Sequence, residues 1–375
     1  MNFCAVLGTY PKDTPGGAEF QSYLIARELA ARGWEAHYVA HQAGETSVET
    51  DEGIVVHRLA RGTQRTRALL QELRTIDADF YYFRNMADLP LAALAKRAVR
   101  GQVVFNISHD RQCDRLFAGW PGQSNRTRFN SLLRRGQLAV YRTLLRVPDQ
   151  LFVQTRAQQA LLAVNHGLSG TLVGNGHPVP ELDTQKIEPP VVLWLASLKA
   201  WKRPELFCYL AAACGDLDCQ FWLVGRPSDE AVTKRVTGRL DALPNAEYKG
   251  GCDIEESNDY LARASLFVNT SKNEGFPNTF IQAWFRETPV VSLEVDPDGV
   301  LAEGEVGAKA DSPAALESLV RDLIEDDARR LRLGEQARAY AIEQHDIRRV
   351  VNRVEEALVG RVTTPETEEV SEAAR

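Results

Sequence analysis

The feature that most restricts the fold of this chain is the alternation of short apolar runs with amphipathic segments along most of its 375 residues. The apolar runs have the length of buried strands, whereas segments such as 18–31 and 89–99 carry apolar residues at helical spacing. Strands that alternate with helices predict parallel, doubly wound sheets. We therefore expect an α/β fold, with runs at 3–7, 35–40, 54–59, 79–83, 103–107 and 151–153 as the first strands.

A proline-rich stretch near the middle of the chain predicts a linker between two domains. It begins at Asn175-Gly176-His177-Pro178-Val179-Pro180 and ends at Pro189-Pro190, after which the alternation restarts. We expect residues 1–180 and 185–345 to form two domains that face each other, with the default ligand site in the cleft between them. A helix at 346–360 follows, and the glutamate-rich residues 361–375 predict a disordered acidic tail.

Composition excludes several classes of protein. The net charge of −7 argues against nucleic-acid binding. No run of about 18 apolar residues occurs, so we expect no membrane-spanning helix. The six cysteines include no Cys-x-x-Cys pair, which predicts reduced thiols in a cytoplasmic protein and no zinc site.

The run from Asn273 to Gln282 is the most informative local motif. It follows an apolar run at 265–269 and precedes a helix expected from Phe280, which places Glu274 on a turn at the carboxyl end of a strand. Ligands bind at that edge of open α/β sheets, and a glycine there lets the backbone come close to them. We expect the backbone amides of Asn278, Thr279 and Phe280 to be free and to face an anionic ligand.

Three further loops also follow predicted strands. Gly16 and Gly17 lie in a loop that matches neither the dinucleotide fingerprint nor a P-loop, and a turn without a ligand is the alternative. His109 follows the run 103–107, where a structural histidine is the alternative to a cleft residue. Lys202 and Arg203, together with Lys199, precede a helix and suit a phosphate, although such cations also occur on solvated surfaces.

Taken in order, these motifs resemble the family-four retaining glycosyltransferases, whose fold is called GT-B. The resemblance covers residues 1–359 and adds Asn175-Gly176, Gly225 and Pro289-Val290-Val291 to the loops above. It implies two Rossmann-like domains, with a nucleotide-diphosphate sugar bound mainly to the second and the acceptor mainly to the first. It also implies that the helix at 346–360 crosses back onto the first domain.

The resemblance also implies roles for individual residues. His109, Lys202 and Glu274 match the catalytic positions of the family. The implied contacts are, for the donor diphosphate, Gly16, Gly17, Ser197, Lys202 and Arg203; for the donor sugar, Glu274, Gly275, Phe276, Pro277, Asn278 and Thr279; and for the nucleoside, Gly225, Arg226, Gly250, Gly251 and Gln282.

Two positions depart from the family pattern. Gln282 stands where the motif has its second glutamate, and Ser197 stands where many relatives carry an arginine. A glutamine can accept from one ribose hydroxyl but must donate to the other. Because hydrogen bonds to charged groups are stronger than neutral ones, we expect a loss of about 1 kcal/mol in donor affinity.

The resulting hypothesis is metal-independent glycosyl transfer with retention, without a cofactor, to a saccharide or lipid-linked acceptor in cell-surface glycan assembly. The arginine-rich residues 126–146, from Arg126 to Arg146, predict either a solvated basic face or contact with the inner face of the membrane. A sugar-nucleotide epimerase or hydrolase of the same fold and a non-catalytic donor-binding scaffold stay open as alternatives. A nicotinamide-dependent dehydrogenase fits poorly, because the dinucleotide fingerprint is absent.

Overall fold

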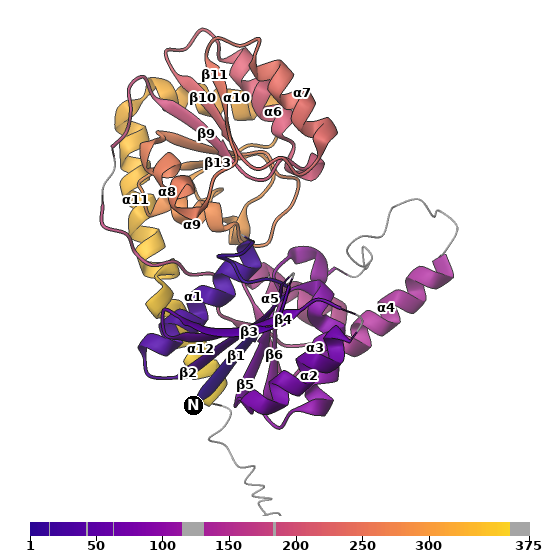
Figure 1. The fold of residues 1–375 in the computed structure, drawn as a ribbon. Coiled ribbons are helices and arrows are strands. Elements are labelled where there is room, and N and C mark those ends of the chain that lie inside the picture. The colour runs from indigo at the N-terminus through magenta and orange to yellow at the C-terminus, as the bar shows by residue number, and fades with distance from the viewer. Residues whose placement is uncertain (15, 43, 63, 115–130, 183–184, 361–375) are drawn as a thin grey trace, which may run out of the picture.

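The computed structural model describes residues 1–375 except 15, 43, 63, 115–130, 183–184 and 361–375, and for 131–135 it describes the backbone alone. The strands form two separate sheets, one in each half of the chain, as Figure 1 shows. The first sheet has the order β3-β4-β2-β1-β5-β6-β7-β8. Its strands are β1 (Asn2–Val6), β2 (Glu35–Gln42), β3 (Ser47–Asp51), β4 (Ile54–Ala60), β5 (Phe80–Phe83), β6 (Gln102–Asn106), β7 (Gln150–Val153) and β8 (Thr171–Leu172).

The second sheet has the order β11-β10-β9-β12-β13-β14, and all of its paired strands are parallel. In the first sheet, β3 alone pairs in the antiparallel sense, with β4. The strands of the second sheet are β9 (Val191–Leu195), β10 (Gln220–Val224), β11 (Ala246–Gly250), β12 (Leu266–Asn269), β13 (Val290–Ser292) and β14 (Gly307–Lys309).

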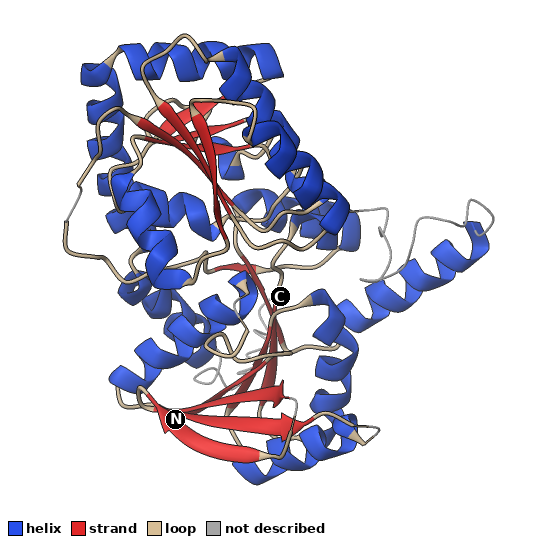
Figure 2. Ribbon diagram, turned by 45° about the horizontal axis from the view of Figure 1, so that its top comes forward, coloured by secondary structure: helices blue, strands red, loops and turns tan. Residues whose placement is uncertain are grey.

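Helices cover both faces of each sheet (Figure 2). In the first half they are α1 (Gly17–Ala31), α2 (Arg65–Ile76), α3 (Leu89–Ala98), α4 (Ser131–Leu145) and α5 (Arg156–His166), with the 3₁₀ turns η1 (Met86–Asp88) and η2 (Asp110–Gln112). The second half contains α6 (Pro204–Ala213), α7 (Glu230–Leu240), α8 (Ile254–Arg263), α9 (Asn278–Trp284), α10 (Pro313–Glu325), α11 (Asp327–His345) and α12 (Ile347–Val359), with η3 (Ala200–Lys202) and η4 (Pro297–Gly299).

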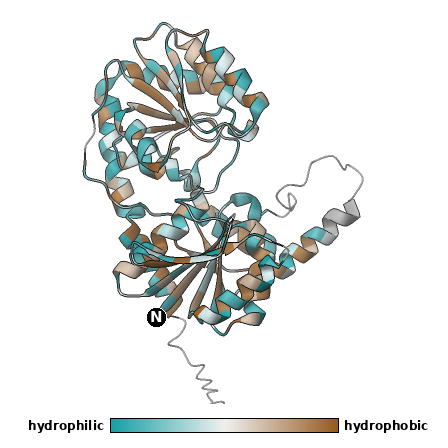
Figure 3. Ribbon diagram, in the orientation of Figure 1, coloured by the Kyte–Doolittle hydropathy of each residue, from teal (hydrophilic) through white to brown (hydrophobic). Residues whose placement is uncertain are grey.

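Each central strand supplies side chains to two hydrophobic cores. In β1, Phe3 and Ala5 join the core under α1, whereas Cys4 and Val6 join the core on the opposite face. Successive side chains of a strand point to opposite faces, so a strand covered on both sides must be apolar throughout. Figure 3 shows this as apolar strands inside helices that are polar on their outer faces. The expected doubly wound α/β architecture is confirmed for both halves.

Among the described strands and α-helices, five were not expected from the sequence: β3, β14, α2, α5 and α8. The strand β3 is an edge strand that is almost wholly exposed, so it lacks an apolar signal; Glu52 and Gly53, both with positive φ, form its turn to β4. The helices α2 and α8 are largely polar and bury only a few side chains. The helix α9 begins at Asn278, two residues before the expected start.

Two connections between the halves cross side by side and bond to each other. The His177 amide donates to the His345 carbonyl at 2.9 Å, and the Ile347 amide donates to the His177 carbonyl at 2.9 Å. The amide group of Gln21, on α1, bonds to both backbone groups of Gly176. This crossing is therefore fixed to the first half of the chain, and we take it as the hinge between the two halves.

The helix α12 packs on the first sheet rather than on the second. Its buried residues Ile347, Val351, Val354 and Leu358 belong to the core under α1. At its exposed edge, Glu355 accepts hydrogen bonds from Arg32 and from the indole nitrogen of Trp34. The end of the chain thus joins the two halves, as the lower yellow helix in Figure 1 shows.

Two expectations concern residues outside the described ranges. Residues 361–375 and the first part of 126–146, with Arg126 and Arg128, are not described. The described part of the basic segment is α4, on which Arg142 and Arg146 donate to carbonyls at the end of α5. Membrane contact through this segment stays a prediction.

Two buried histidines at the hinge make the fold sensitive to acid. Burial lowers the pKa of His345 to about 4 and that of His177 to about 3. Between pH 6.5 and 4 the unfolded chain binds a proton at each site and the folded chain does not, so stability falls as the pH falls. We expect wild type to lose about 2 kcal/mol more than His345→Gln between pH 7 and 5, in urea unfolding at both pH values. Equal losses would contradict a neutral, buried His345.

The docking of α12 gives a second prediction. Replacing Leu358, which is fully buried, by alanine leaves a cavity in the first core. The free energy of unfolding should fall by about 2–5 kcal/mol. Glu356→Ala, an exposed substitution on the same turn, should change it by less than about 0.5 kcal/mol. Denaturant titration of both variants provides the measurement, and equal values would show that α12 does not stabilise the first half.

Candidate functional site

A cavity of about 640 Å³ lies between the two halves, at the carboxyl ends of their strands. The first half supplies residues that follow β1, β5, β6, β7 and β8, and the second supplies the loops after β9, β10 and β12. Parallel strands end at one edge of a sheet, so loops distant in sequence meet there. Of the predicted site residues, the following line this cavity: Gly16, Gly17, His109, Ser197, Lys202, Arg226, Glu274, Gly275, Phe276, Pro277, Asn278 and Thr279.

Lys202 and Glu274 form an ion pair inside the cavity, although 71 residues separate them in the chain. Their side chains are only 16% and 13% exposed, and the Lys202 ammonium also lies 4.3 Å from the centre of the Trp201 ring. The Thr270 hydroxyl donates to the Lys202 carbonyl at 2.8 Å and fixes η3. The pair brings a cation and a carboxylate to one point, as a ligand with both phosphate and hydroxyl groups requires.

His109 reaches the same cavity from the first half. Its Nδ1 accepts a hydrogen bond from the Arg111 amide at 3.2 Å. Burial lowers the pKa of this imidazole, and the nearby charges of Arg111 and Lys202 lower it further against the opposing effect of Glu274. The ring is therefore neutral at pH 7, with its hydrogen on Nε2. A neutral N–H donor suits a sugar hydroxyl.

Gly275 lets the Glu274 loop press against the backbone of the first half. A Cβ at this position would collide with the Ser108 carbonyl and would lie 2.9 Å from Oε1 of Gln154. The same Gln154 oxygen accepts a hydrogen bond from the Phe276 amide at 3.0 Å. The loop that carries Glu274 is thus held by a side chain of the other half of the chain.

Two buried side chains that sequence reasoning assigned no role complete this contact. Asn175 donates to the Phe276 carbonyl at 2.9 Å and accepts from Arg84 at 2.5 Å. Arg84 follows β5, is 1% exposed and lines the cavity. An arginine directly after an apolar strand was the signal that could have identified it. The Asn278 side chain also donates to the Gly17 carbonyl at 3.1 Å, so the glycine loop and the start of α9 touch.

One of the backbone amides expected to be free at the start of α9 already donates a hydrogen bond within the protein. The Phe280 amide donates to the Pro277 carbonyl at 3.1 Å, because a turn forms at the beginning of the helix. The prediction that this amide is free is therefore wrong. Asn278 and Thr279 still line the cavity.

Arg203 lies outside the cavity, contrary to its expected contact with the diphosphate. Its guanidinium donates to the Thr270 and Ser271 carbonyls and pairs with Glu294. The backbone of Arg203 has φ 51°, which turns the chain between η3 and α6. Lys202 and Arg203 are adjacent in sequence, but the Lys202 side chain points into the cavity and the Arg203 side chain pairs with Glu294 outside it.

The glycines expected at the nucleoside contact the loop that carries Arg226. The Gly225 amide donates to the Gly250 carbonyl at 2.7 Å, and a Cβ on Gly251 would collide with the side chain of Arg226. None of the three lines the cavity, whereas Arg226 does. The contacts of Gly225 and Gly251 fix the loop that carries Arg226, and the role of the three glycines at the nucleoside stays a prediction.

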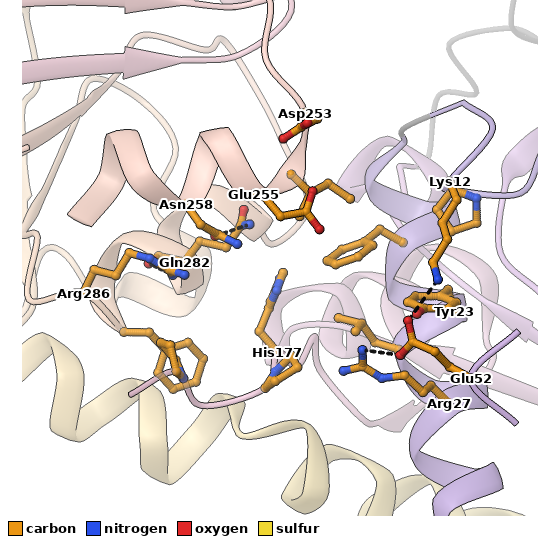
Figure 4. A pocket seen from close by; sticks show the side chains of 17 residues that line it. Lys12, Tyr23, Arg27, Glu52, His177, Asp253, Glu255, Asn258, Gln282 and Arg286 are labelled. Carbon is orange, nitrogen blue, oxygen red and sulfur yellow. Dashed lines mark hydrogen bonds and ion pairs between the residues drawn. The ribbon is translucent and has the colours of Figure 1, made fainter. Parts of the chain in front are cut away.

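Gln282 lines a second cavity of about 580 Å³ between α1 and the pair α8 and α9 (Figure 4). Its Nε2 donates to the Asn258 side chain at 3.1 Å. In Figure 4 it lies across this space from Lys12 and Tyr23. The structure thus separates Gln282 from the Glu274 cavity, although both residues lie in one short segment. Its expected effect on ribose binding stays a prediction.

A contact between the two halves was not foreseen from the sequence. The Asp298 carboxylate, on η4, accepts hydrogen bonds from the Arg156 and Ala157 amides at 2.9 Å each. These amides begin α5, where a helix favours negative charge. Asp298 has φ 54°, and no apolar pattern marks this residue in the sequence. This contact holds η4 of the second half against the first half.

Within the ranges given above, every helix is too short or too polar to span a lipid bilayer. Among the same residues, no three His, Cys, Asp or Glu side chains are grouped as ligands for a metal ion.

Part of the chain matches the model of a known protein family. Residues 189–326 match the model of the family described as glycosyl transferases group 1. A lipopolysaccharide core biosynthesis glycosyltransferase of Rhizobium meliloti, LpsE, is 25% identical over 126 residues, which are 33% of this chain and 36% of LpsE. The aligned part therefore spans about a third of that relative.

Solved structures resemble nearly the whole chain. Sucrose-phosphate synthase from Thermosynechococcus elongatus has a TM-score of 0.78 at 16% identity, covering 96% of this chain and 99% of that one. HepE of Anabaena, in complex with UDP and glucose, has a TM-score of 0.75 at 18% identity, covering 96% and 100%. At these identities the likeness establishes the fold, which is GT-B as expected.

The tight approach of Gly275 gives a test of the closed site. Gly275→Ala should force the Glu274 loop away from Ser108, because the new Cβ has no space. We expect a larger radius of gyration in solution scattering, because the displaced loop no longer closes against the first half. Gly238→Ala, on α7 with open space around its Cβ position, is the matched control and should leave the radius of gyration unchanged. An unchanged radius of gyration in Gly275→Ala would show that the two halves do not need this contact to stay closed.

Proposed function

We propose that this chain, which has the GT-B fold and matches the group 1 glycosyltransferase model over residues 189–326, transfers a sugar from a nucleotide-diphosphate donor with retention at the anomeric carbon. The observation that carries this proposal is the meeting of Lys202 and Glu274 in the cavity between the two halves. An ammonium group beside a carboxylate in this cavity supports a donor that carries both phosphate and hydroxyl groups.

We propose that the donor separates this ion pair and replaces each partner. The sugar hydroxyls would donate to the Glu274 carboxylate, while Lys202 would contact the diphosphate. Negative charge grows on the diphosphate as its bond to the sugar breaks, so an ammonium group there stabilises the transition state more than the bound substrate. His109, neutral and with its hydrogen on Nε2, would donate to the sugar.

The proposed course of the reaction needs no carboxylate as a nucleophile. The acceptor hydroxyl would attack on the face from which the diphosphate leaves, and a diphosphate oxygen would take its proton. The contacts of the Glu274 loop with Gln154, Asn175 and Gly17 support this proposal, because they close the two halves around the site. Closure expels water, which would otherwise hydrolyse the donor.

The neighbours suggest the donor and the setting. HepE was solved with UDP and glucose, and we propose a UDP-sugar as the first donor class to examine. LpsE acts in lipopolysaccharide core biosynthesis, which supports an acceptor in cell-surface glycan assembly at the cytoplasmic face of the membrane. Without an acceptor, a hydrolase would release the nucleotide at full rate and an epimerase would convert the donor into its epimer, whereas a transferase needs an acceptor.

Substitutions in the ion pair test the assignment. Lys202→Ala and Glu274→Ala should each lower the rate of UDP release with donor and acceptor by about 100- to 1,000-fold, the effect of losing one preorganised charged contact. Lys234→Ala, an exposed lysine on α7, should retain the wild-type rate. Proton NMR of the product reports whether the anomeric configuration is kept. Wild-type turnover by Glu274→Ala, or an inverted product, would contradict the proposal.

A further inference from the structure

A separate cavity of about 560 Å³ lies within the first half of the chain, and the proposed donor chemistry does not use it. It opens at the carboxyl ends of β1, β2 and β4, beside the start of α1. Its apolar part includes Leu69 and Leu91, and its polar part includes Arg61, Arg65, Glu19 and Asp88. Such a mixture of an apolar wall and a few charged groups is typical of a ligand site.

Arg61 and Arg65 form the cationic side of this cavity. They come from the connection between β4 and α2 and from the first residue of α2, and both are exposed. Neither guanidinium has a hydrogen bond or an ion pair with a described residue, whereas the nearby Arg58 pairs with Asp13 and Glu49. Burial lowers the pKa of the neighbouring His41, and the two arginines lower it further. An anion would complete this side of the cavity.

Glu19 and Asp88 form the acidic side. The Asn85 side chain donates to Glu19 at 2.9 Å, and the Asp88 amide donates to the Asn85 carbonyl at 2.9 Å, so Asn85 links the two residues. Oδ2 of Asp88 is buried without a hydrogen-bond partner among the described residues. Burial, with the charge of Glu19, raises the pKa of Asp88 to about 7. Carboxyl groups of this kind bind hydroxyls.

The cavity adjoins the donor site through Glu19. The Glu19 carboxylate lies directly against Gly16, where a Cβ would collide with it, and Gly16 lines the cavity of Lys202 and Glu274. Arg84, which precedes Asn85, lines that cavity as well. A molecule held between Glu19 and Arg65 would therefore have one end close to the glycine loop of the donor site.

We infer that this cavity binds the acceptor, and that the acceptor is a saccharide with an anionic group, phosphate or carboxylate, held by Arg61 and Arg65 while its hydroxyls bond to Glu19 and Asp88. This inference rests on the proposed function. Arginine recognises both anions through two parallel N–H donors, so the two share one binding chemistry. A neutral acceptor would leave both guanidinium groups without an anionic partner and would contact only the acidic side of the cavity.

Calorimetry on the full chain saturated with UDP tests this inference. The probes are glucose, glucose 6-phosphate and glucuronate, which differ in having no anion, a phosphate or a carboxylate. We expect at least one anionic probe to bind at least about tenfold more tightly than glucose, and the tighter of the two identifies the anion. In Arg61→Gln/Arg65→Gln, that affinity should fall by about 10- to 100-fold toward the value for glucose, while UDP binding stays unchanged. Arg67→Gln, an exposed arginine of α2 that does not line the cavity, is the matched control and should behave as wild type.

The outcomes separate the two proposals. If UDP binds but glucose binds as tightly as both anionic probes, or if the preference persists in the double variant, this inference is overturned and the donor site stands. If UDP itself does not bind to the wild-type chain, the proposed function is contradicted, and the acceptor site that rests on it is contradicted as well. Circular dichroism of the double variant checks that both substitutions leave the fold intact.

Discussion

The candidate site depends on one close approach, that of the Glu274 loop to the backbone of the other half of the chain. Gly275 permits it, because a side chain larger than hydrogen would meet the Ser108 carbonyl. Once the loop is there, Gln154 and Asn175 take up the two backbone groups of Phe276. These hydrogen bonds fix the position of Glu274 relative to His109 and to the glycine loop, which come from the first half.

The burial of the site between the two halves also determines its electrostatics. Lys202 and Glu274 are mostly removed from water, and each compensates the charge of the other in the absence of a donor. A buried charge without a partner is costly, and the pairing of Lys202 with Glu274 offsets that cost. Burial also lowers the pKa of the His109 imidazole, so the ring is neutral at pH 7. It can therefore donate a hydrogen bond without adding a positive charge beside Lys202.

Away from the Glu274 loop, the described residues join the two halves in three further, physically different ways. The hinge is a backbone crossing between His177 and residues 345–347, the helix α12 adds apolar packing, and Asp298 adds a charge at the start of α5. Hydrogen bonds with exposed partners exchange with water more easily than buried apolar contacts do. We therefore expect opening of the cleft to break the contact of Asp298 before that of α12.

The sequence by itself determined the fold class and the loops of the site. Buried parallel strands must be apolar on both faces, so their runs are visible without a structure, and Glu274, Lys202 and His109 each follow such a run. Polar or exposed elements such as β3 and α8 carry no such signal and were missed. Which neighbours in sequence share a site depends on the tertiary structure. The Lys202 side chain points into the cavity, the adjacent Arg203 side chain points away from it, and Gln282 lines another cavity. Side-chain direction within a loop depends on backbone angles and on partners far along the chain, such as Thr270 and Asn258, and local sequence does not specify either.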